Sequence, residues 1–203
     1  MSTKVWLVLG GAGVTCASAA GGYYVFSSKE LTIEEEFSNR RFIPLDNGDQ
    51  WIEEFKSDKE NIKKSIGELK DATDENGGTQ LRDWCQRQMK LNAKKNLKSF
   101  ELVGKYCLIR DLASQLSRNK KTLLTDTSLA SDWTSTYQKR KDKNTDRAGV
   151  GLSEQWTNAQ QDADLTKIKG WCSDTSKGDF LASDKEKYTN LLKWCTKEGA
   201  QEE

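Results

Sequence analysis

The chain has 203 residues, and its 32 basic and 31 acidic side chains nearly cancel. A nucleic-acid-binding protein would normally show a basic face, which this balance does not support. Histidine is absent, which excludes Ser-His-Asp and Cys-His catalytic systems and His-ligated metal sites. All charged residues except Lys4 follow residue 28, so an apolar start is joined to a highly charged remainder.

Residues 5–26 form an uninterrupted stretch without a charge, long enough as a helix to span the roughly 30 Å hydrocarbon layer of a bilayer. Lys4 precedes this stretch, and the positive end of such a segment stays in the cytoplasm. We therefore expect residues 1–28 to be an uncleaved signal anchor, with a single crossing of the cell membrane and the C-terminal domain outside the cell. A cleaved secretory signal and a lipoprotein signal remain open, because residues 17–19 (Ala-Ser-Ala) resemble a cleavage site and Cys16 resembles a lipid-attachment residue.

A short pattern occurs four times after residue 28: an apolar residue is followed three positions later by an aromatic residue and then by a cysteine. The four aromatic-cysteine pairs are Trp84-Cys85, Tyr106-Cys107, Trp171-Cys172 and Trp194-Cys195. Because positions i, i+3 and i+4 share one face of a helix, each copy places an apolar side chain, a ring and a thiol together.

The copies fall into two halves that repeat. Each half begins with a tryptophan and a second aromatic residue four positions later, Trp51/Phe55 and Trp133/Tyr137. This self-similarity predicts a tandem duplication. The predicted division is a linker at residues 29–44, repeat 1 at residues 45–118, and repeat 2 at residues 119–203 with a short polar tail.

Apolar residues recur with helical spacing in both halves, and no segment sustains the alternation typical of a strand. We therefore predict an all-α fold, in which an N-terminal transmembrane or signal helix is followed by two tandem helical repeat units of about three helices each. The expected helices span residues 48–70, a segment around Trp84, residues 98–117, residues 129–141, residues 164–172 and residues 183–197, with a turn at residues 71–78.

The part of the chain after residue 28 is poor in apolar residues, so its core has to form around large aromatic side chains. Structural roles are predicted for Trp51, Trp84, Trp133, Trp171 and Trp194. Trp156 matches the pattern of neither repeat.

The four cysteines after residue 28 are predicted to form disulfides, because thiols outside the cytoplasm tend to be oxidised. Four cysteines allow three connectivities, and the duplication favours Cys85–Cys107 and Cys172–Cys195, one bridge in each repeat. Free buried thiols are the main alternative. A zinc site would need closely paired ligands, and a nucleophilic cysteine would need a base such as histidine, so we predict no metal, no cofactor and no catalytic residue.

With its Gly/Ala-rich apolar start, its Trp-x-x-x-aromatic pairs and its repeated Trp-Cys motifs, the chain resembles the large paralogous families of hypothetical proteins of haemotropic mycoplasmas, the wall-less bacteria that live on red cells. The resemblance covers nearly the whole chain, and Tyr106-Cys107 departs from it by using tyrosine where tryptophan is commoner. It implies a surface-displayed protein that varies in sequence, consistent with antigenic variation or host interaction. It brings no catalytic residues with it.

We expect a membrane-anchored surface protein without enzymatic activity, acting as a variable antigen or host-interaction module. Its predicted partners are the lipid bilayer, through residues 5–26, and a host surface or plasma protein, with no nucleic acid and no small-molecule substrate. One alternative is a secreted or anchored hydrolase that uses a carboxylate pair. The other is a structural membrane protein that pairs through Gly13, Ala17 and Gly21, which recur every four residues.

Overall fold

The computed structural model describes residues 30–153 and 155–202, and these residues form nine α-helices and four 3-10 helices with no β-strand among them. The all-α prediction is confirmed for this part of the chain. The α-helices are α1 (Ile33–Glu36), α2 (Gly48–Ser57), α3 (Lys59–Ser65), α4 (Gly77–Met89), α5 (Leu97–Tyr106), α6 (Leu112–Arg118), α7 (Ala130–Asp142), α8 (Gln161–Thr175) and α9 (Lys185–Cys195). The 3-10 helices are η1 (Gly67–Leu69), η2 (Ala148–Val150), η3 (Trp156–Asn158) and η4 (Lys197–Ala200).

The predicted membrane segment, residues 5–26, lies outside the described residues. Within residues 30–153 and 155–202, no helix is both long enough and apolar enough to cross a membrane. The anchor therefore stays a prediction from the sequence.

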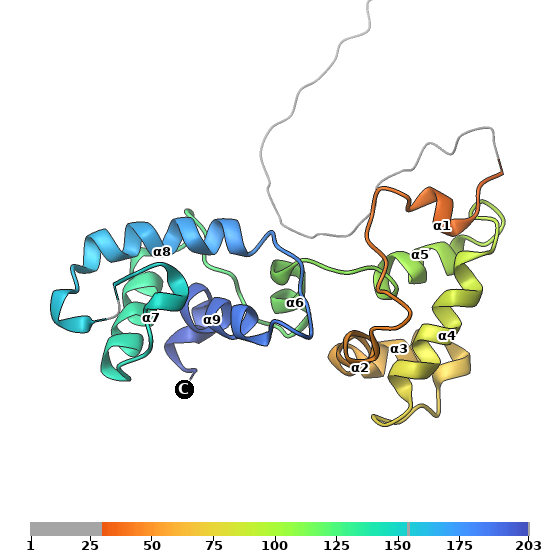
Figure 1. The fold of residues 1–203 in the computed structure, drawn as a ribbon, viewed down its shortest axis with the longest axis horizontal. Coiled ribbons are helices and arrows are strands. Elements are labelled where there is room, and N and C mark those ends of the chain that lie inside the picture. Colours follow the sequence, from red (N-terminus) through yellow and green to blue (C-terminus); the bar gives the residue numbers. More distant parts are fainter. Residues whose placement is uncertain (1–29, 154, 203) are drawn as a thin grey trace, which may run out of the picture.

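The helices form two lobes, α1 to α5 in one and α6 to α9 in the other (Figure 1). Each lobe has its own hydrophobic core. The first core runs from Ile33 to Ile109 and the second from Leu112 to Cys195. The chain therefore passes from one core to the other within residues 110–111, and α6 packs in the second core, although the sequence analysis assigned residues 112–118 to repeat 1.

Two of the predicted helices are interrupted. The segment 48–70 is divided into α2, α3 and η1, because Asp58 leaves the helical conformation (φ −145°) between α2 and α3. The segment 98–117 is divided into α5 and α6, because residues 107–111 are not helical. The prediction of one continuous helix in each of these segments is therefore wrong.

Residues 107–109 leave the helix in order to pair with an earlier segment, and the second lobe contains the same pairing. The N–H of Ile43 donates to the carbonyl of Cys107 (2.9 Å), and the N–H of Leu124 donates to the carbonyl of Cys195 (2.7 Å). The return bonds also correspond: Ile109 N–H to Arg41 (2.8 Å), and Lys197 N–H to Thr122 (2.9 Å). In each lobe the chain just after the last cysteine is thus tied to the segment that precedes α2 or α7.

A second pairing relates α1 to α6. The N–H of Ile33 donates to the carbonyl of Leu91 (2.9 Å), and the N–H of Leu112 donates to the carbonyl of Gly178 (2.8 Å). Both donors are the first residues of their helices. The return bonds are Ala93 N–H to Leu31 (3.0 Å) and Phe180 N–H to Arg110 (2.8 Å).

These equivalent hydrogen bonds define two matching units, unit 1 at residues 31–109 and unit 2 at residues 110–197. In this register α1 corresponds to α6, α2 to α7, α4 to α8 and α5 to α9. Unit 1 therefore begins inside the predicted linker, and unit 2 begins before the predicted boundary at residue 118. Because α1 has only four residues, its apolar spacing is too short to be recognised in a sequence.

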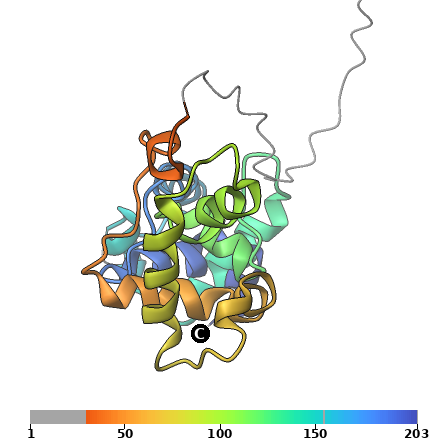
Figure 2. The same cartoon turned by 90° about the vertical axis from the view of Figure 1, so that its right-hand side faces the viewer.

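The two units differ in how closely two of their helices pack together, α2 and α4 in unit 1 and α7 and α8 in unit 2. α4 crosses α2 in unit 1 (Figure 2), and Gly78 lies against the backbone there: a Cβ at this position would be 2.8 Å from the backbone nitrogen of Ile52. The neighbouring Gly77 lies against the Phe55 ring. Counting by the same offset that relates Cys85 to Cys172, the residues of unit 2 at these two positions are Asp164 and Leu165. Since both carry side chains, α8 cannot lie on α7 in the same way.

We predict that Gly78→Ala destabilises the protein by about 1–3 kcal/mol, because an added methyl group has no room between α4 and α2. Gly170→Ala is the matched control: Gly170 also lies inside a helix, and a Cβ there would meet nothing within 4 Å. The control should stabilise by about 0.5–1 kcal/mol, since alanine favours the helix over glycine. Urea unfolding followed by circular dichroism tests both changes, and equal effects would contradict the close approach.

Candidate functional site

The cysteines lie where the repeat predicts them. Disulfides join Cys85 to Cys107 and Cys172 to Cys195, with Cα–Cα distances of 5.8 and 5.6 Å. All four residues are buried. Each bridge links the first long helix after the loop, α4 or α8, to the last helix of its unit, so the thiols serve to tie helices together.

Four of the five predicted structural tryptophans are buried, and Trp171 lies half-buried at the margin of the second core. The first tryptophan of each unit makes the same contact. The indole N–H of Trp51 donates to the carbonyl of Pro44 (2.9 Å), and that of Trp133 donates to the carbonyl of Thr125 (3.4 Å). Each ring thus closes the turn that leads into its helix.

Trp156, which matches neither repeat, belongs to an aromatic cluster in unit 2. Its ring stacks on Trp194 (centroids 6.1 Å apart), meets Tyr137 edge to face (5.4 Å), and lies 4.6 Å from the guanidinium carbon of Arg147. The residue lies between α7 and α8. The stretch from Trp133 to Cys172 that contains it is five residues longer than the stretch from Trp51 to Cys85 in unit 1. This difference in spacing, 82 residues between Trp51 and Trp133 but 87 between Cys85 and Cys172, was the signal in the sequence for an inserted element.

A buried ion pair lies beneath Trp156. Arg147 is fully buried; its Nη2 is 2.5 Å from Asp164 Oδ2, and its Nη1 donates to the carbonyl of Gln155 (2.9 Å). The Tyr137 hydroxyl donates to the same carboxylate oxygen (2.7 Å). Burial, aided by the hydrogen bond to Asp164 and by its charge, raises the pKa of Tyr137 to about 12.

The Tyr137–Asp164–Arg147 cluster contains charged groups such as an active site has, but its residues are buried and connect neighbouring elements of the fold. Arg147 and Tyr137 are 0% and 2% exposed, so a substrate has no access to them. Their contacts join α7, the following loop and the start of α8. The sequence carries no signal for this cluster, because the corresponding residues of unit 1 are Phe55 and Gly77 and no repeated polar pattern marks it.

A second buried charge network joins the two units. Glu54 of α2 is 3% exposed and accepts hydrogen bonds from Arg110 and, at 2.7 Å, from Arg118. Arg110 also donates to Gln115 (3.0 Å). Burial lowers the pKa of Arg110, and the carboxylate of Glu54 opposes that shift.

Gln50, one turn before Glu54 on α2, adds two hydrogen bonds across the same interface. Its Nε2 donates to the carbonyl of Phe180 (3.1 Å), and its Oε1 accepts from the N–H of Ala182 (2.7 Å). Gln50 is 1% exposed, so its side chain is shielded from water. The two units are therefore held together by polar side chains whose partners are complete.

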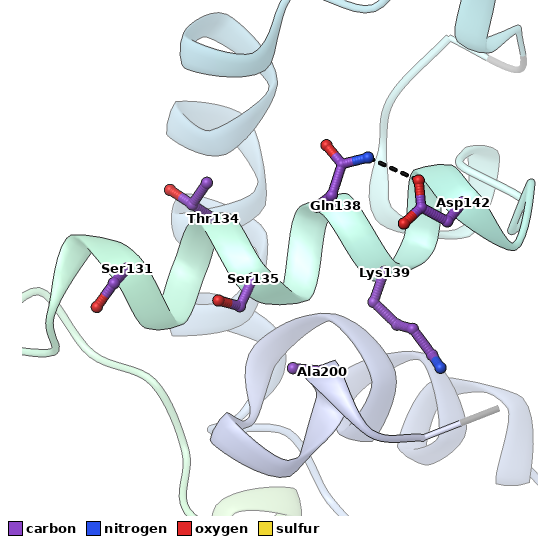
Figure 3. A pocket seen from close by; sticks show the side chains of 7 residues that line it. All are labelled: Ser131, Thr134, Ser135, Gln138, Lys139, Asp142 and Ala200. Carbon is purple, nitrogen blue, oxygen red and sulfur yellow. Dashed lines mark hydrogen bonds between the residues drawn. The ribbon is translucent and has the colours of Figure 1, made fainter.

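The groove between α7 and η4 has a volume of about 560 Å³ (Figure 3). The close-up shows Gln138 donating to Asp142 (2.6 Å) on the exposed side of α7. The groove is open, and the larger part of its surface is apolar although most of its lining residues are polar. It contains no buried titratable group. It is lined by Ser131, Thr134, Ser135, Gln138, Lys139, Asp142 and Ala200.

Arg140, on the buried side of α7, holds η4 in place. Its side chain is fully buried, and Nη2 donates to the carbonyls of Gly199 (3.1 Å) and Glu202. Thr136 adds a hydrogen bond to the carbonyl of Thr196 (3.3 Å). The wall of the groove formed by η4 is thus built by the chain itself.

Among the described residues, no group of three or more Cys, Asp or Glu side chains is arranged to hold a metal ion. Comparison with known protein families, with curated proteins and with solved structures finds no match to this chain. The resemblance to mycoplasma surface proteins therefore stays a prediction.

We predict that Asp164→Ala destabilises the protein by about 3–5 kcal/mol, because it leaves Arg147 buried without its partner. Asp162→Ala is the control on the same helix. Asp162 is exposed, and its loss from the first turn should cost at most about 1 kcal/mol. Urea unfolding measures both changes. A small effect of Asp164→Ala would show that the ion pair does not stabilise the fold.

The pKa of Tyr137 gives a prediction for alkaline pH. Because the folded-state pKa is raised from about 10 to about 12, the neutral hydroxyl stabilises the fold fully below pH 10. That contribution is lost between pH 10 and pH 12, as the unfolded chain ionises and the folded chain does not. The wild type should therefore lose stability relative to Tyr137→Phe over this range, as measured by urea unfolding at a series of pH values. A constant difference between the two proteins would contradict the assigned pKa.

Proposed function

We propose that the protein is a membrane-anchored surface protein, whose two disulfide-bonded helical units lie outside the cell and act as a variable antigen or host-contact module without enzymatic activity. The observation that carries the proposal is the pair of buried disulfides. Disulfides form and persist outside the reducing cytoplasm, and here every cysteine of the described residues is in one. The disulfides thus support an oxidising compartment for the chain from residue 30 onward.

The anchor in this proposal is residues 5–26, which would cross the bilayer once with Lys4 on the cytoplasmic side. In unit 1 the first described helix, α1, begins at Ile33. The folded domain would thus begin within a few residues of the outer membrane surface.

The way the core is built supports a variable surface. Most of the buried positions are aromatic and aliphatic side chains and disulfide-bonded cysteines, and one face of each long helix supplies them. The opposite faces are exposed and polar. Substitutions on such exposed positions change stability by about 0.5 kcal/mol or less, so the outer faces could vary while the fold is kept.

The proposed contact is with a host surface or plasma protein, through exposed helix faces such as the hydroxyl-rich side of α7 (Figure 3). The family proposed is that of the paralogous surface proteins of haemotropic mycoplasmas, on the strength of the repeated aromatic-cysteine motifs. Both proposals follow from the sequence and are compatible with the open character of this groove.

No specific observation favours the hydrolase alternative. A general acid would need a carboxyl group with a raised pKa, whereas hydrogen bonds from Lys59 and Lys187 lower the pKa of Asp74 and Asp184. The structural membrane protein alternative depends on Gly13, Ala17 and Gly21, which lie outside the described residues.

Protease treatment of intact cells tests the proposal. Trypsin should remove the epitopes of residues 30–202 from intact cells and leave a cytoplasmic marker protein uncut. Lysed cells provide the control, because they show whether trypsin can cut the folded domain at all. If the domain is cut in lysed cells but survives on intact cells, the outward orientation is wrong.

A further inference from the structure

Arg140 and Trp194 of unit 2 have buried nitrogen atoms without a hydrogen-bond acceptor among the described residues. The atoms are Nε and Nη1 of Arg140 and Nε1 of Trp194. Arg140 is 0% exposed and Trp194 is 1% exposed, so bulk water does not reach these atoms. A buried N–H without an acceptor is costly, and more so where the group is charged. These atoms therefore indicate an acceptor that the described chain does not itself supply.

The charge of Arg140 is not neutralised by a directly bound carboxylate of the described residues. Its Nη2 donates to two backbone carbonyls, one in η4 and one just after it. The side chain of Glu202 binds Lys121 (2.6 Å) and acts on Arg140 only through its charge. Arg147 is also fully buried and also has an unpaired Nε, but it is in direct contact with Asp164 (2.5 Å). Arg140 thus differs from Arg147 in being a buried cation without a bound anion.

The corresponding place in unit 1 contains a donor and an acceptor. By the offset that relates the first tryptophans of the two units, Asp58 corresponds to Arg140. By the offset that relates their last cysteines, Tyr106 corresponds to Trp194. The hydroxyl of Tyr106 donates to Oδ2 of Asp58 (3.0 Å). Because α7 and α9 also pack together, we expect Trp194 and Arg140 to face one site, where unit 2 has two donors and no carboxylate.

The number of unpaired hydrogens favours an anion over a water molecule. Nε of Arg140 carries one hydrogen, its Nη1 carries two and Nε1 of Trp194 carries one, and neither side chain has an acceptor. A water molecule would accept only two of these hydrogen bonds, and its own hydrogens would have no acceptor on the two side chains. A halide ion accepts several N–H bonds at once, and such charge-assisted bonds are the stronger kind.

We propose that Arg140 and Trp194 together bind a single chloride ion between α7 and α9. Nε and Nη1 of Arg140 and Nε1 of Trp194 donate to the ion, which takes the place that the carboxylate of Asp58 has in unit 1. Neither residue lines the described cavities of about 150 to 560 Å³, so the ligand of this site has to be very small. This inference is independent of where the protein lies in the cell.

The test uses the full chain in detergent micelles prepared without halide, and it follows the indole N–H signal of Trp194 by NMR, assigned through Trp194→Phe. Sodium chloride should shift this signal in a saturable way, whereas sodium gluconate, whose anion is too large for the site, should not. Urea unfolding gives a second readout, because urea adds no ions. Once chloride exceeds its dissociation constant, each further tenfold rise should raise the folding equilibrium constant about tenfold over gluconate at equal ionic strength.

Three variants separate the site from general effects of salt. Arg140→Met removes the charge and should abolish the saturable shift. Trp194→Phe removes one donor and keeps Arg140, so it should weaken chloride binding at least tenfold in the unfolding readout; it also serves if Arg140→Met does not fold. Lys141→Met is the matched control, because Lys141 is exposed beside Arg140 on α7 and should keep the full response when changed. The proposal is wrong if chloride causes no saturable shift, if gluconate acts equally, or if the Lys141 control loses the response.

Discussion

The second cysteine of each unit joins three segments of the chain, and the rest of the fold depends on this junction. The sulfur of Cys107 is bonded to α4, its carbonyl accepts a hydrogen bond from Ile43, and the preceding Tyr106 is fully buried. Cys195 has the same three connections, to α8, to Leu124 and through a buried aromatic residue. A chain so rich in charged residues buries few apolar side chains, so covalent ties between its helices have a large share in its stability.

The two units share these connections but differ in how their helices pack. Unit 1 is closed by direct contact of two helices, which Gly77 and Gly78 permit. In unit 2 the helices are farther apart, and part of the space is filled by Trp156 and Arg147 from the segment between α7 and α8 and by Asp164 of α8. Burying a charge is costly unless it is paired, and the two terminal nitrogens of Arg147 are paired with Asp164 and with the carbonyl of Gln155.

The disulfides and several helices could be predicted from the sequence, because aromatic rings and cysteines at fixed helical spacing allow the helices few packing arrangements. The disulfide pairing follows from the duplication, and the helices that carry Trp133, Cys172 and Cys195 lie close to their expected positions. The start of each unit could not be predicted, since it is defined by backbone hydrogen bonds that any side chain can make. The looser packing of α8 on α7 could not be predicted either, because it depends on the distance between two helices, which their sequences alone do not fix.

The most direct test of the account is peptide mapping, without reduction, of the protein isolated from its own cells after free thiols have been blocked. The account predicts peptides that link Cys85 to Cys107 and Cys172 to Cys195, with none of the four thiols blocked. Such a result would support both the two closed units and their oxidising location. A Cys85–Cys172 link would contradict the independent units. Four blocked thiols would contradict both the disulfides and the surface location.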